Sequence, residues 1–255
     1  MHELPLVIFT VLAQSAVGVV LFATLMMLVG QLDNSTYVKA LVVALVLLII
    51  GGGASMFHLG QPLRAFNVLA GVGRSPMSNE IMTTVLFGGL LFATTVFAFR
   101  QQAEGATKAL SLAASLAGIA LLFVIPSIYT IESVAQWNTP YTVIQMVLTA
   151  LAVGSVMIVM LGNNHKVSYV TMLILLAGMT MMPGYLTYLA ASSPALLEQS
   201  MQFWGLKVGL AGLAILSLSQ VKTRGVVPAS FAAVLVLASE FAGRVGFFEL
   251  WNMGM

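Results

Sequence analysis

Cysteine is missing from the 255 residues of this chain, and histidine occurs only three times. Without cysteine, this protein forms no disulfide, no thiolate zinc site and no iron–sulfur cluster of its own. A transmembrane b-type haem usually needs two histidines that project into a helix bundle. Because His2, His58 and His165 all fall outside the middle of the apolar segments, we expect no haem and no metal site here.

Charged residues are also scarce. They make up 7% of the sequence, whereas soluble domains carry roughly 25%. Hydrophobic residues account for 60%, more than a core surrounded by water could hide, so lipid must be the main solvent. We therefore predict an all-α polytopic integral membrane protein with a single domain over residues 1–255. The N-terminal MHELPLVIFT lacks a basic region before its apolar run, so we expect a retained helix and not a cleaved signal peptide.

Long apolar segments divide the sequence. A membrane-spanning helix needs about 20 mostly apolar residues, and short polar turns separate about eight such segments. We predict helices at about 5–29, 38–58, 79–100, 108–130, 140–161, 167–190, 202–221 and 226–249. Gly51, Gly52 and Gly53 favour close helix packing, and the Pro183–Gly184 pair predicts a kink. The residues around Pro194 and Glu198 are expected to form a loop.

Lysine and arginine are unevenly distributed between the two sets of connections. Short cytoplasmic loops carry an excess of these residues. The basic set, at or beside alternate connections, consists of Lys39, Arg100, Lys108, Lys166, Lys222 and Arg224. We therefore place these connections on the cytoplasmic side. Both termini and the connection at 58–80 then face outward, towards the periplasm of a Gram-negative bacterium.

Apart from the basic residues at the cytoplasmic ends, few ionisable residues lie within or at the ends of the apolar segments, and these lie towards the outer side. They are His58, Glu80, Lys207, Glu240 and Arg244. Charge is costly in a bilayer, so such residues are functional candidates. Glu240 and Arg244 share a helix face and can pair, either as a structural ion pair or within a binding site. Lys207 is expected to extend to the headgroups. The sequence therefore predicts a polar pocket near the outer leaflet, with no ionisable group near the middle of the membrane.

The connection HLGQPLRAFNVLAGVGRSPMSNE at 58–80 concentrates polar side chains between two spans. Its ends, His58 and Glu80, belong to neighbouring helices at similar depth, and Asn79 is a candidate N-cap. Oxidation of a quinol releases two protons and two electrons. A histidine can accept a proton near neutral pH, and a carboxylate at the lipid–water boundary can pass it to solvent. These residues therefore predict a quinol site, with a partner protein to take the electrons.

Four motifs in this sequence resemble those of one family. They are HExPLxIFT from His2, HLGxPxRAFN from His58, SNEI from Ser78 and ExxGRxxFF from Glu240. Together they resemble the membrane anchor subunit of dimethyl sulfoxide reductase, the DmsC family, over the whole length. The resemblance implies an inner-membrane anchor of anaerobic respiration that oxidises menaquinol and passes electrons to an iron–sulfur subunit. That subunit in turn feeds a catalytic subunit with a molybdenum bis-pterin cofactor.

The resemblance and the charge pattern select overlapping residues. The family ties the His of HLG and the Glu of SNE to its quinol site, and these fall on His58 and Glu80. The full predicted quinol-binding set is His58, Glu80, Arg64, Asn67, Glu240 and Arg244. The residues predicted to dock the iron–sulfur partner are Arg64, Phe66 and Arg74.

Two alternative functions stay open at this point. A secondary transporter would use a broken helix, such as one at Pro183–Gly184. Transporters favour sites at the membrane midplane, however, and there this sequence predicts no ionisable group. A proton-pumping anchor of the polysulfide reductase type would need a polar path across the inner half. Tyr129, Gln145, hydroxyl side chains and water would have to supply that path.

Overall fold

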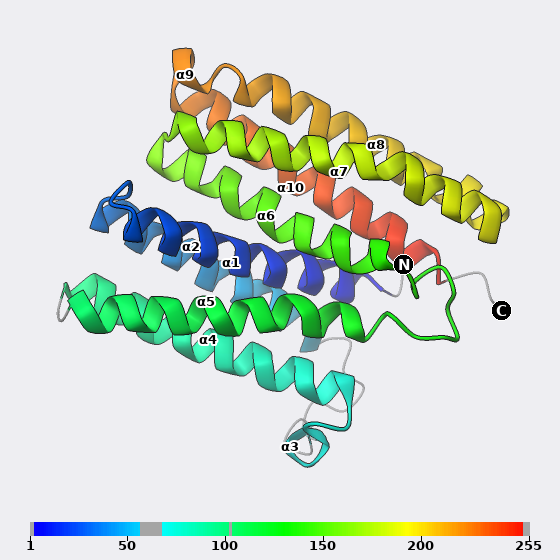
Figure 1. Ribbon diagram of the computed structural model, residues 1–255, viewed down its shortest axis with the longest axis horizontal. Helices are drawn as coiled ribbons and strands as arrows, with labels where there is room; N and C mark the ends of the chain where they lie inside the picture. The colour runs from blue at the N-terminus through cyan, green and yellow to red at the C-terminus, as the bar shows by residue number, and fades with distance from the viewer. Residues whose placement is uncertain (1–2, 57–67, 102–103, 252–255) are drawn as a thin grey trace.

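The computed structural model describes residues 3–56, 68–101 and 104–251. Over these ranges it contains eight helices that are long and apolar enough to cross a membrane (Figure 1). They are α1 (Leu4–Leu28), α2 (Asn34–Met56), α4 (Pro76–Arg100), α5 (Glu104–Ser127), α6 (Pro140–Gly162), α7 (His165–Ser192), α8 (Pro194–Leu218) and α10 (Val226–Glu249). Two short helices, α3 (Val68–Gly71) and α9 (Val221–Arg224), lie in connections. The predicted fold class and the number of spans are confirmed.

Helix α8 begins earlier than the sequence pattern indicated. It starts at Pro194, not near residue 202. Proline suits the first turn of a helix, because its φ angle is already helical and the N–H that it lacks would have no partner there. The residues around Pro194 and Glu198, predicted as a loop, therefore form the first turns of α8. Every later residue of α8 is therefore farther from the start of the helix than the sequence pattern indicated.

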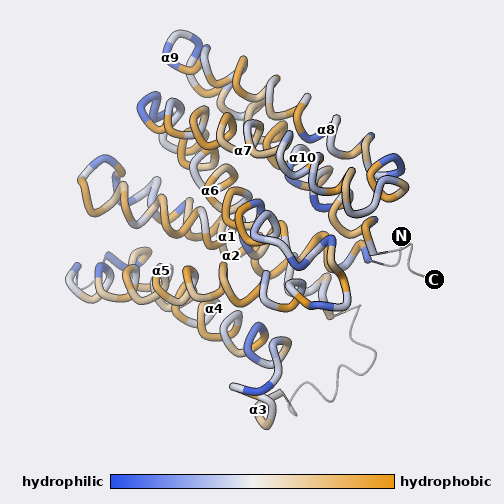
Figure 2. The backbone as a smooth tube through the Cα atoms, turned by 45° about the vertical axis from the view of Figure 1, so that its right-hand side comes forward, coloured by the Kyte–Doolittle hydropathy of each residue, from blue (hydrophilic) through white to orange (hydrophobic). Residues whose placement is uncertain are grey.

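The long helices form one bundle in which successive helices run in opposite directions (Figure 1). Helices α1, α6 and α10 bury most of their surface, whereas α2, α4, α7 and α8 bury little. Large apolar side chains, such as Phe92, Leu173 and Leu216, are exposed on the outer helices. Figure 2 shows hydrophobic colouring along the helices and hydrophilic colouring mainly at the turns. This distribution is the one expected of a bundle surrounded by lipid.

Helices α1 and α6 cross closely at small residues. A Cβ atom on Gly18 would lie 1.8 Å from the carbonyl oxygen of Ala150, and one on Gly154 would lie 2.2 Å from the carbonyl carbon of Gly18. Such distances leave no room for a side chain. Small residues allow membrane helices to approach in this way. The crossing joins α1, which also contacts α2 and α5, to the half of the bundle that contains α6 and α10.

Helix α2 packs on α1 at one of the three predicted packing glycines. A Cβ atom on Gly51 would lie 3.1 Å from Cβ of Leu12, so the prediction is confirmed there. Gly52 and Gly53 have no described neighbour within 4 Å and do not mediate such a contact.

The first residues of α1 and the last of α10 lie at the same end of the bundle (Figure 1). We call this the terminal end. It also contains α3 and the start of α4, whereas α9 lies at the opposite end. The first and last helices therefore begin and end on one side of the bundle, as predicted. That this side faces outward stays a prediction.

Helix α4 is capped by Ser75 and not by Asn79 as predicted. The Ser75 hydroxyl accepts a hydrogen bond from the backbone N–H of Ser78, and Pro76 occupies the first turn. The Asn79 side chain points back to the preceding turn, where its Oδ1 accepts a hydrogen bond from the N–H of Gly73 at 2.7 Å. Both contacts fix the start of α4 at the terminal end.

Candidate functional site

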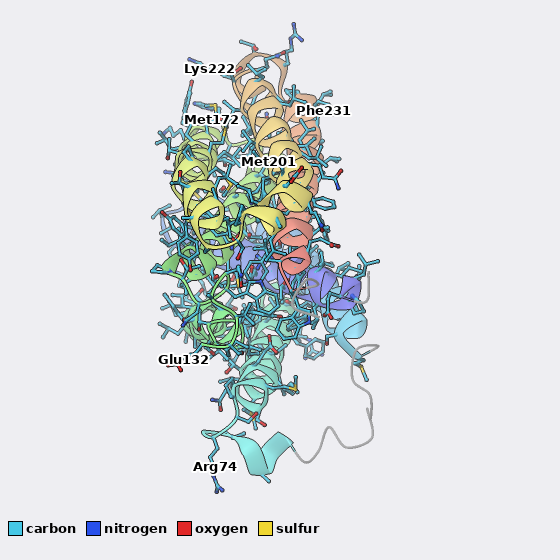
Figure 3. The ribbon with its side chains drawn as sticks, turned by 90° about the vertical axis from the view of Figure 1, so that its right-hand side faces the viewer. Arg74, Glu132, Met172, Met201, Lys222 and Phe231 are labelled. Carbon is cyan, nitrogen blue, oxygen red and sulfur yellow. The ribbon has the colours of Figure 1, made fainter. Side chains whose placement is uncertain are left out.

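The structure describes half of the predicted site residues. Those outside the described residues are His58, Arg64, Phe66 and Asn67, whose roles stay predictions. Those within them are Arg74, Glu80, Glu240 and Arg244. Arg74 is exposed in the turn between α3 and α4. Figure 3, which looks towards the terminal end, shows its side chain projecting away from the bundle.

Glu80 is buried near the terminal end of the bundle. It lies in the second turn of α4 and is 9% exposed. Its Oε1 atom has no hydrogen-bond partner among the described residues. Buried polar atoms in proteins normally have a partner, so this oxygen is a free acceptor within the described ranges. A carboxyl group in this state can bind a hydroxyl group and take its proton.

Aromatic side chains close the terminal end between α5 and α10. The rings of Tyr129, Trp137, Phe247 and Phe248 contact one another, with Trp137 stacked on Phe247 at a centroid distance of 5.1 Å. Trp137 Nε1 donates a hydrogen bond to the carbonyl oxygen of Phe247 at 2.9 Å. This bond ties the connection before α6 to the last turns of α10. We call these four residues the aromatic cluster.

Tyr129 connects the aromatic cluster electrostatically to two of the predicted site residues. Burial raises the pKa of its hydroxyl group well above the ordinary value for tyrosine. The negative charge of Glu80 raises this pKa further, and the positive charge of Arg244 lowers it. Both charges therefore act on the Tyr129 hydroxyl, which stays protonated at neutral pH and can donate a hydrogen bond.

Glu240 forms a buried ion pair with Lys207. Lys207 Nζ lies 2.8 Å from Glu240 Oε2, and the two residues are 9% and 6% exposed. The prediction that Lys207 extends to the headgroups is wrong, because α8 begins at Pro194 and this places Lys207 at the middle of the helix. Gly243 makes room for the side chain, since a Cβ atom there would lie 2.5 Å from Cδ of Lys207. The ion pair therefore lies near the middle of α8 and not in its first turn.

Arg244 binds neutral side chains and not Glu240. Its Nη2 atom donates hydrogen bonds to Oε1 of Gln14 at 2.7 Å and to Oγ1 of Thr149 at 3.2 Å. Thr149 Oγ1 donates in turn to Oε2 of Glu240 at 2.6 Å. The predicted direct pair is therefore wrong, although both residues do share a face of α10. Thr149 lies between them and belongs to α6.

These contacts form a polar core that joins α1, α6, α8 and α10. We use this name for the five residues that these bonds connect, Gln14, Thr149, Lys207, Glu240 and Arg244, and for Gln145, which lies one turn before Thr149 on α6. All six residues are buried. In their ordinary ionised forms they carry two positive charges and one negative charge. Three of their buried nitrogen atoms have no hydrogen-bond partner among the described residues: Gln14 Nε2, Gln145 Nε2 and Arg244 Nη1.

Sequence reasoning missed two members of this core. Gln14 and Thr149 carry no charge, so a search for ionisable residues in the apolar segments passes over them. The sequence does contain a signal for Gln14, which is an amide inside an otherwise apolar segment. Such polar residues usually hydrogen-bond across helices. Thr149 has no such signal, since threonine commonly bonds within its own helix. In the described part of the protein, no cluster of histidine, aspartate and glutamate is suited to hold a metal ion.

Comparisons with known proteins extend over nearly the whole sequence. Residues 1–250 match the DMSO reductase anchor subunit (DmsC) family. The anaerobic dimethyl sulfoxide reductase chain YnfH of Escherichia coli is 31% identical over 271 aligned positions, which span 98% of this protein and 95% of that one.

Two further relatives match over shorter stretches. A chain of the anaerobic dimethyl sulfoxide reductase of Haemophilus influenzae is 40% identical over 157 residues, which span 60% of this protein and 56% of the relative. A subunit of the sulfite dehydrogenase of Allochromatium vinosum is 34% identical over 146 residues, which span 52% of this protein and 45% of the relative.

Proposed function

This chain belongs to the DMSO reductase anchor subunit (DmsC) family, and we propose that it oxidises menaquinol at its terminal end and passes the electrons to an iron–sulfur partner. Family membership and eight apolar helices make it a multi-pass protein of the bacterial inner membrane. Its relatives include components of dimethyl sulfoxide reductase and of sulfite dehydrogenase. It is therefore an anchor in a molybdoenzyme complex with catalytic and electron-transfer partners.

The observation that carries the proposal is the buried carboxyl group of Glu80. Oxidation of a quinol removes two protons and two electrons, and the protons need an acceptor at the hydroxyl groups. Glu80 Oε1 has no partner among the described residues, so it can accept a hydrogen bond from one hydroxyl and then its proton. The site lies at the end of a helix, from which that proton can leave to water.

The electrons must leave this subunit. Because the sequence has no cysteine, it holds no thiolate-bound iron–sulfur cluster that could receive them. We assign that role to an iron–sulfur subunit docked on the terminal end, which passes the electrons to a catalytic subunit with the molybdenum cofactor. The exposed Arg74, which projects from this end (Figure 3), suits such a contact, together with Arg64 and Phe66.

The other predicted residues take supporting roles in this proposal. His58 serves as the second proton acceptor, and Arg64 and Asn67 orient the quinol head or the connection that carries them. Arg244 and the protonated hydroxyl of Tyr129 supply hydrogen bonds to the second quinol oxygen, since the charge of Arg244 acts on Tyr129. Glu240 supports Arg244 indirectly through the shared hydrogen-bond partner Thr149.

A substitution of Glu80 tests the proposal in the assembled complex. In membrane vesicles, Glu80→Gln should lower quinol-dependent reduction of the terminal acceptor by roughly 10²-fold, the usual scale for loss of a general base. Reduction of the acceptor by an artificial dye that bypasses the anchor should be unchanged. Glu132→Gln is the matched control, because Glu132 is exposed in a connection at the same end (Figure 3). Normal quinol-dependent turnover in Glu80→Gln would contradict the assignment.

One observation supports a second candidate, a proton-pumping anchor of the polysulfide reductase type. The pair of Lys207 and Glu240 places ionisable groups near the middle of the bundle, where a path across the membrane would need them. Vesicles containing the complex would distinguish the two. A pump takes up protons inside and releases them outside in excess of those from quinol, whereas a simple anchor releases only the quinol protons. The family match favours either anchor over a secondary transporter.

A further inference from the structure

A small cavity lies between α6, α7, α8 and α10, beside the ion pair of the polar core. Its lining includes Gln145 of α6, Met182 of α7, Lys207 of α8 and Glu240 of α10. Its volume is about 20 Å³, which exceeds the roughly 10–15 Å³ that one water molecule needs. The cavity is therefore large enough for a small polar molecule and too small for a quinone ring.

Three polar side chains that line this cavity have unused hydrogen-bonding capacity. Gln145 is 4% exposed, and its Nε2 atom has no partner among the described residues. Glu240 receives its two described hydrogen bonds on Oε2, which leaves Oε1 as an acceptor. Lys207 Nζ carries three protons, of which one is used in the described bond to Glu240. The cavity thus presents donors and an acceptor together.

The charges around the cavity limit what can bind there. Lys207 and Arg244 outnumber Glu240, so a cation or an extra proton would add to an existing positive surplus. An anion would lie against the Glu240 carboxylate, which lines the cavity. An apolar molecule would leave the amide of Gln145 unpaired. A neutral molecule that both donates and accepts hydrogen bonds fits all of these groups.

We propose that this cavity is a water-binding site within the membrane-spanning bundle. The water accepts a hydrogen bond from Gln145 Nε2 and donates one to Glu240, beside the ammonium group of Lys207. It thereby solvates an ion pair that a dry bilayer would destabilise. The water also links Gln145 of α6 to Glu240 of α10, two side chains with no described bond to one another. It does not depend on quinol chemistry, so its test can fail without affecting the proposed function.

Radiolytic hydroxyl labelling of the assembled complex in membranes tests the site directly. Brief X-ray pulses generate hydroxyl radicals from bound water, and these oxidise adjacent methionines, which mass spectrometry quantifies. Met182 lines the cavity and is 2% exposed. Met157 of α6 is 6% exposed and does not line it. We expect Met182 to be oxidised several-fold faster than Met157. Equal or slower oxidation of Met182 would overturn the proposal.

Two variants of α6 make the test specific. Gln145→Leu removes the amide and places an apolar group against the cavity, so oxidation of Met182 should fall to the level of Met157. Ser155→Ala is the control, because the Ser155 hydroxyl is buried on the same helix and bonds only to backbone oxygens of that helix. It should leave the ratio unchanged. If Gln145→Leu does not assemble, the comparison of Met182 with Met157 in the native complex still decides.

Discussion

Glu80 and Glu240 are both buried, but they differ in their hydrogen-bond partners and in their place in the bundle. Glu240 is fixed by Lys207 and Thr149 in the middle of the bundle. Glu80 lies near the terminal end with a carboxyl oxygen that has no described partner. A buried charge that is paired contributes to holding helices together, whereas a carboxyl group left unpaired is available to bind and exchange a proton. The comparison therefore separates a structural glutamate from a candidate proton acceptor.

The surroundings of the two residues explain the difference. Glu240 belongs to α10, which packs against α1, α6 and α8 and so meets their polar side chains. Glu80 belongs to α4, whose main contacts in the described part of the protein are with α2, α3 and α5. Among the described residues, no hydrogen-bond partner reaches Glu80 Oε1, and the charge of Glu80 acts on Tyr129.

The largest effect on stability should come from breaking the ion pair. Lys207→Met leaves Glu240 buried beside an uncharged neighbour, which typically costs about 3–5 kcal/mol. The free energy of unfolding can be measured from the SDS concentration at which the purified complex loses its helical circular dichroism. Lys222→Met, at an exposed lysine, is the control and should change little. Equal free energies of unfolding for the two variants would show that the pair of Lys207 and Glu240 does not stabilise the bundle.

A second, smaller loss should come from the crossing that joins the two halves of the bundle. Gly18→Ala places a methyl group within van der Waals overlap of Ala150, and overpacking of this kind costs about 1–3 kcal/mol. The same unfolding measurement applies. Gly52→Ala adds the same methyl group where no described atom lies within 4 Å and should be close to neutral. If both variants behave alike, α1 and α6 do not cross at Gly18.

Weakening the aromatic cluster should lower the free energy of unfolding by a smaller amount. Trp137→Phe keeps an aromatic ring but removes the hydrogen bond to the Phe247 carbonyl, a loss of about 1 kcal/mol. Because the cluster contains Tyr129, quinol-dependent turnover should fall as well, while dye-dependent turnover should not. Phe99→Leu, at an exposed ring near the last residue of α4, provides the comparison. Unchanged turnover in Trp137→Phe would separate the cluster from the proposed site.

The smallest change in stability should come from Glu80 itself. Glu80→Gln preserves the shape of the side chain and breaks no described bond of Oε1, so the free energy of unfolding should shift by less than about 1 kcal/mol. The same variant should lose quinol-dependent turnover. A destabilisation as large as that of Lys207→Met would instead show that Glu80, like Glu240, has a structural partner.

The sequence by itself determined the solvent of this protein and the number of its spans. Long apolar segments with few charges are stable only in lipid, where helices satisfy their own backbone, so eight segments became eight helices. It also selected Glu80, Lys207, Glu240 and Arg244 as residues to examine, because charge is rare in this protein. These conclusions depend on local composition and need no knowledge of which helices touch.

Only the tertiary structure decided which of these residues are partners. Spacing on α10 suggested that Glu240 pairs with Arg244. In the structure, Lys207 of α8 and Thr149 of α6 instead donate the hydrogen bonds to Glu240. The depth of Lys207 in turn depends on where α8 begins, at a proline that the sequence pattern assigned to a loop. Pairing across helices follows from packing and register, and no periodicity within a single segment contains that information.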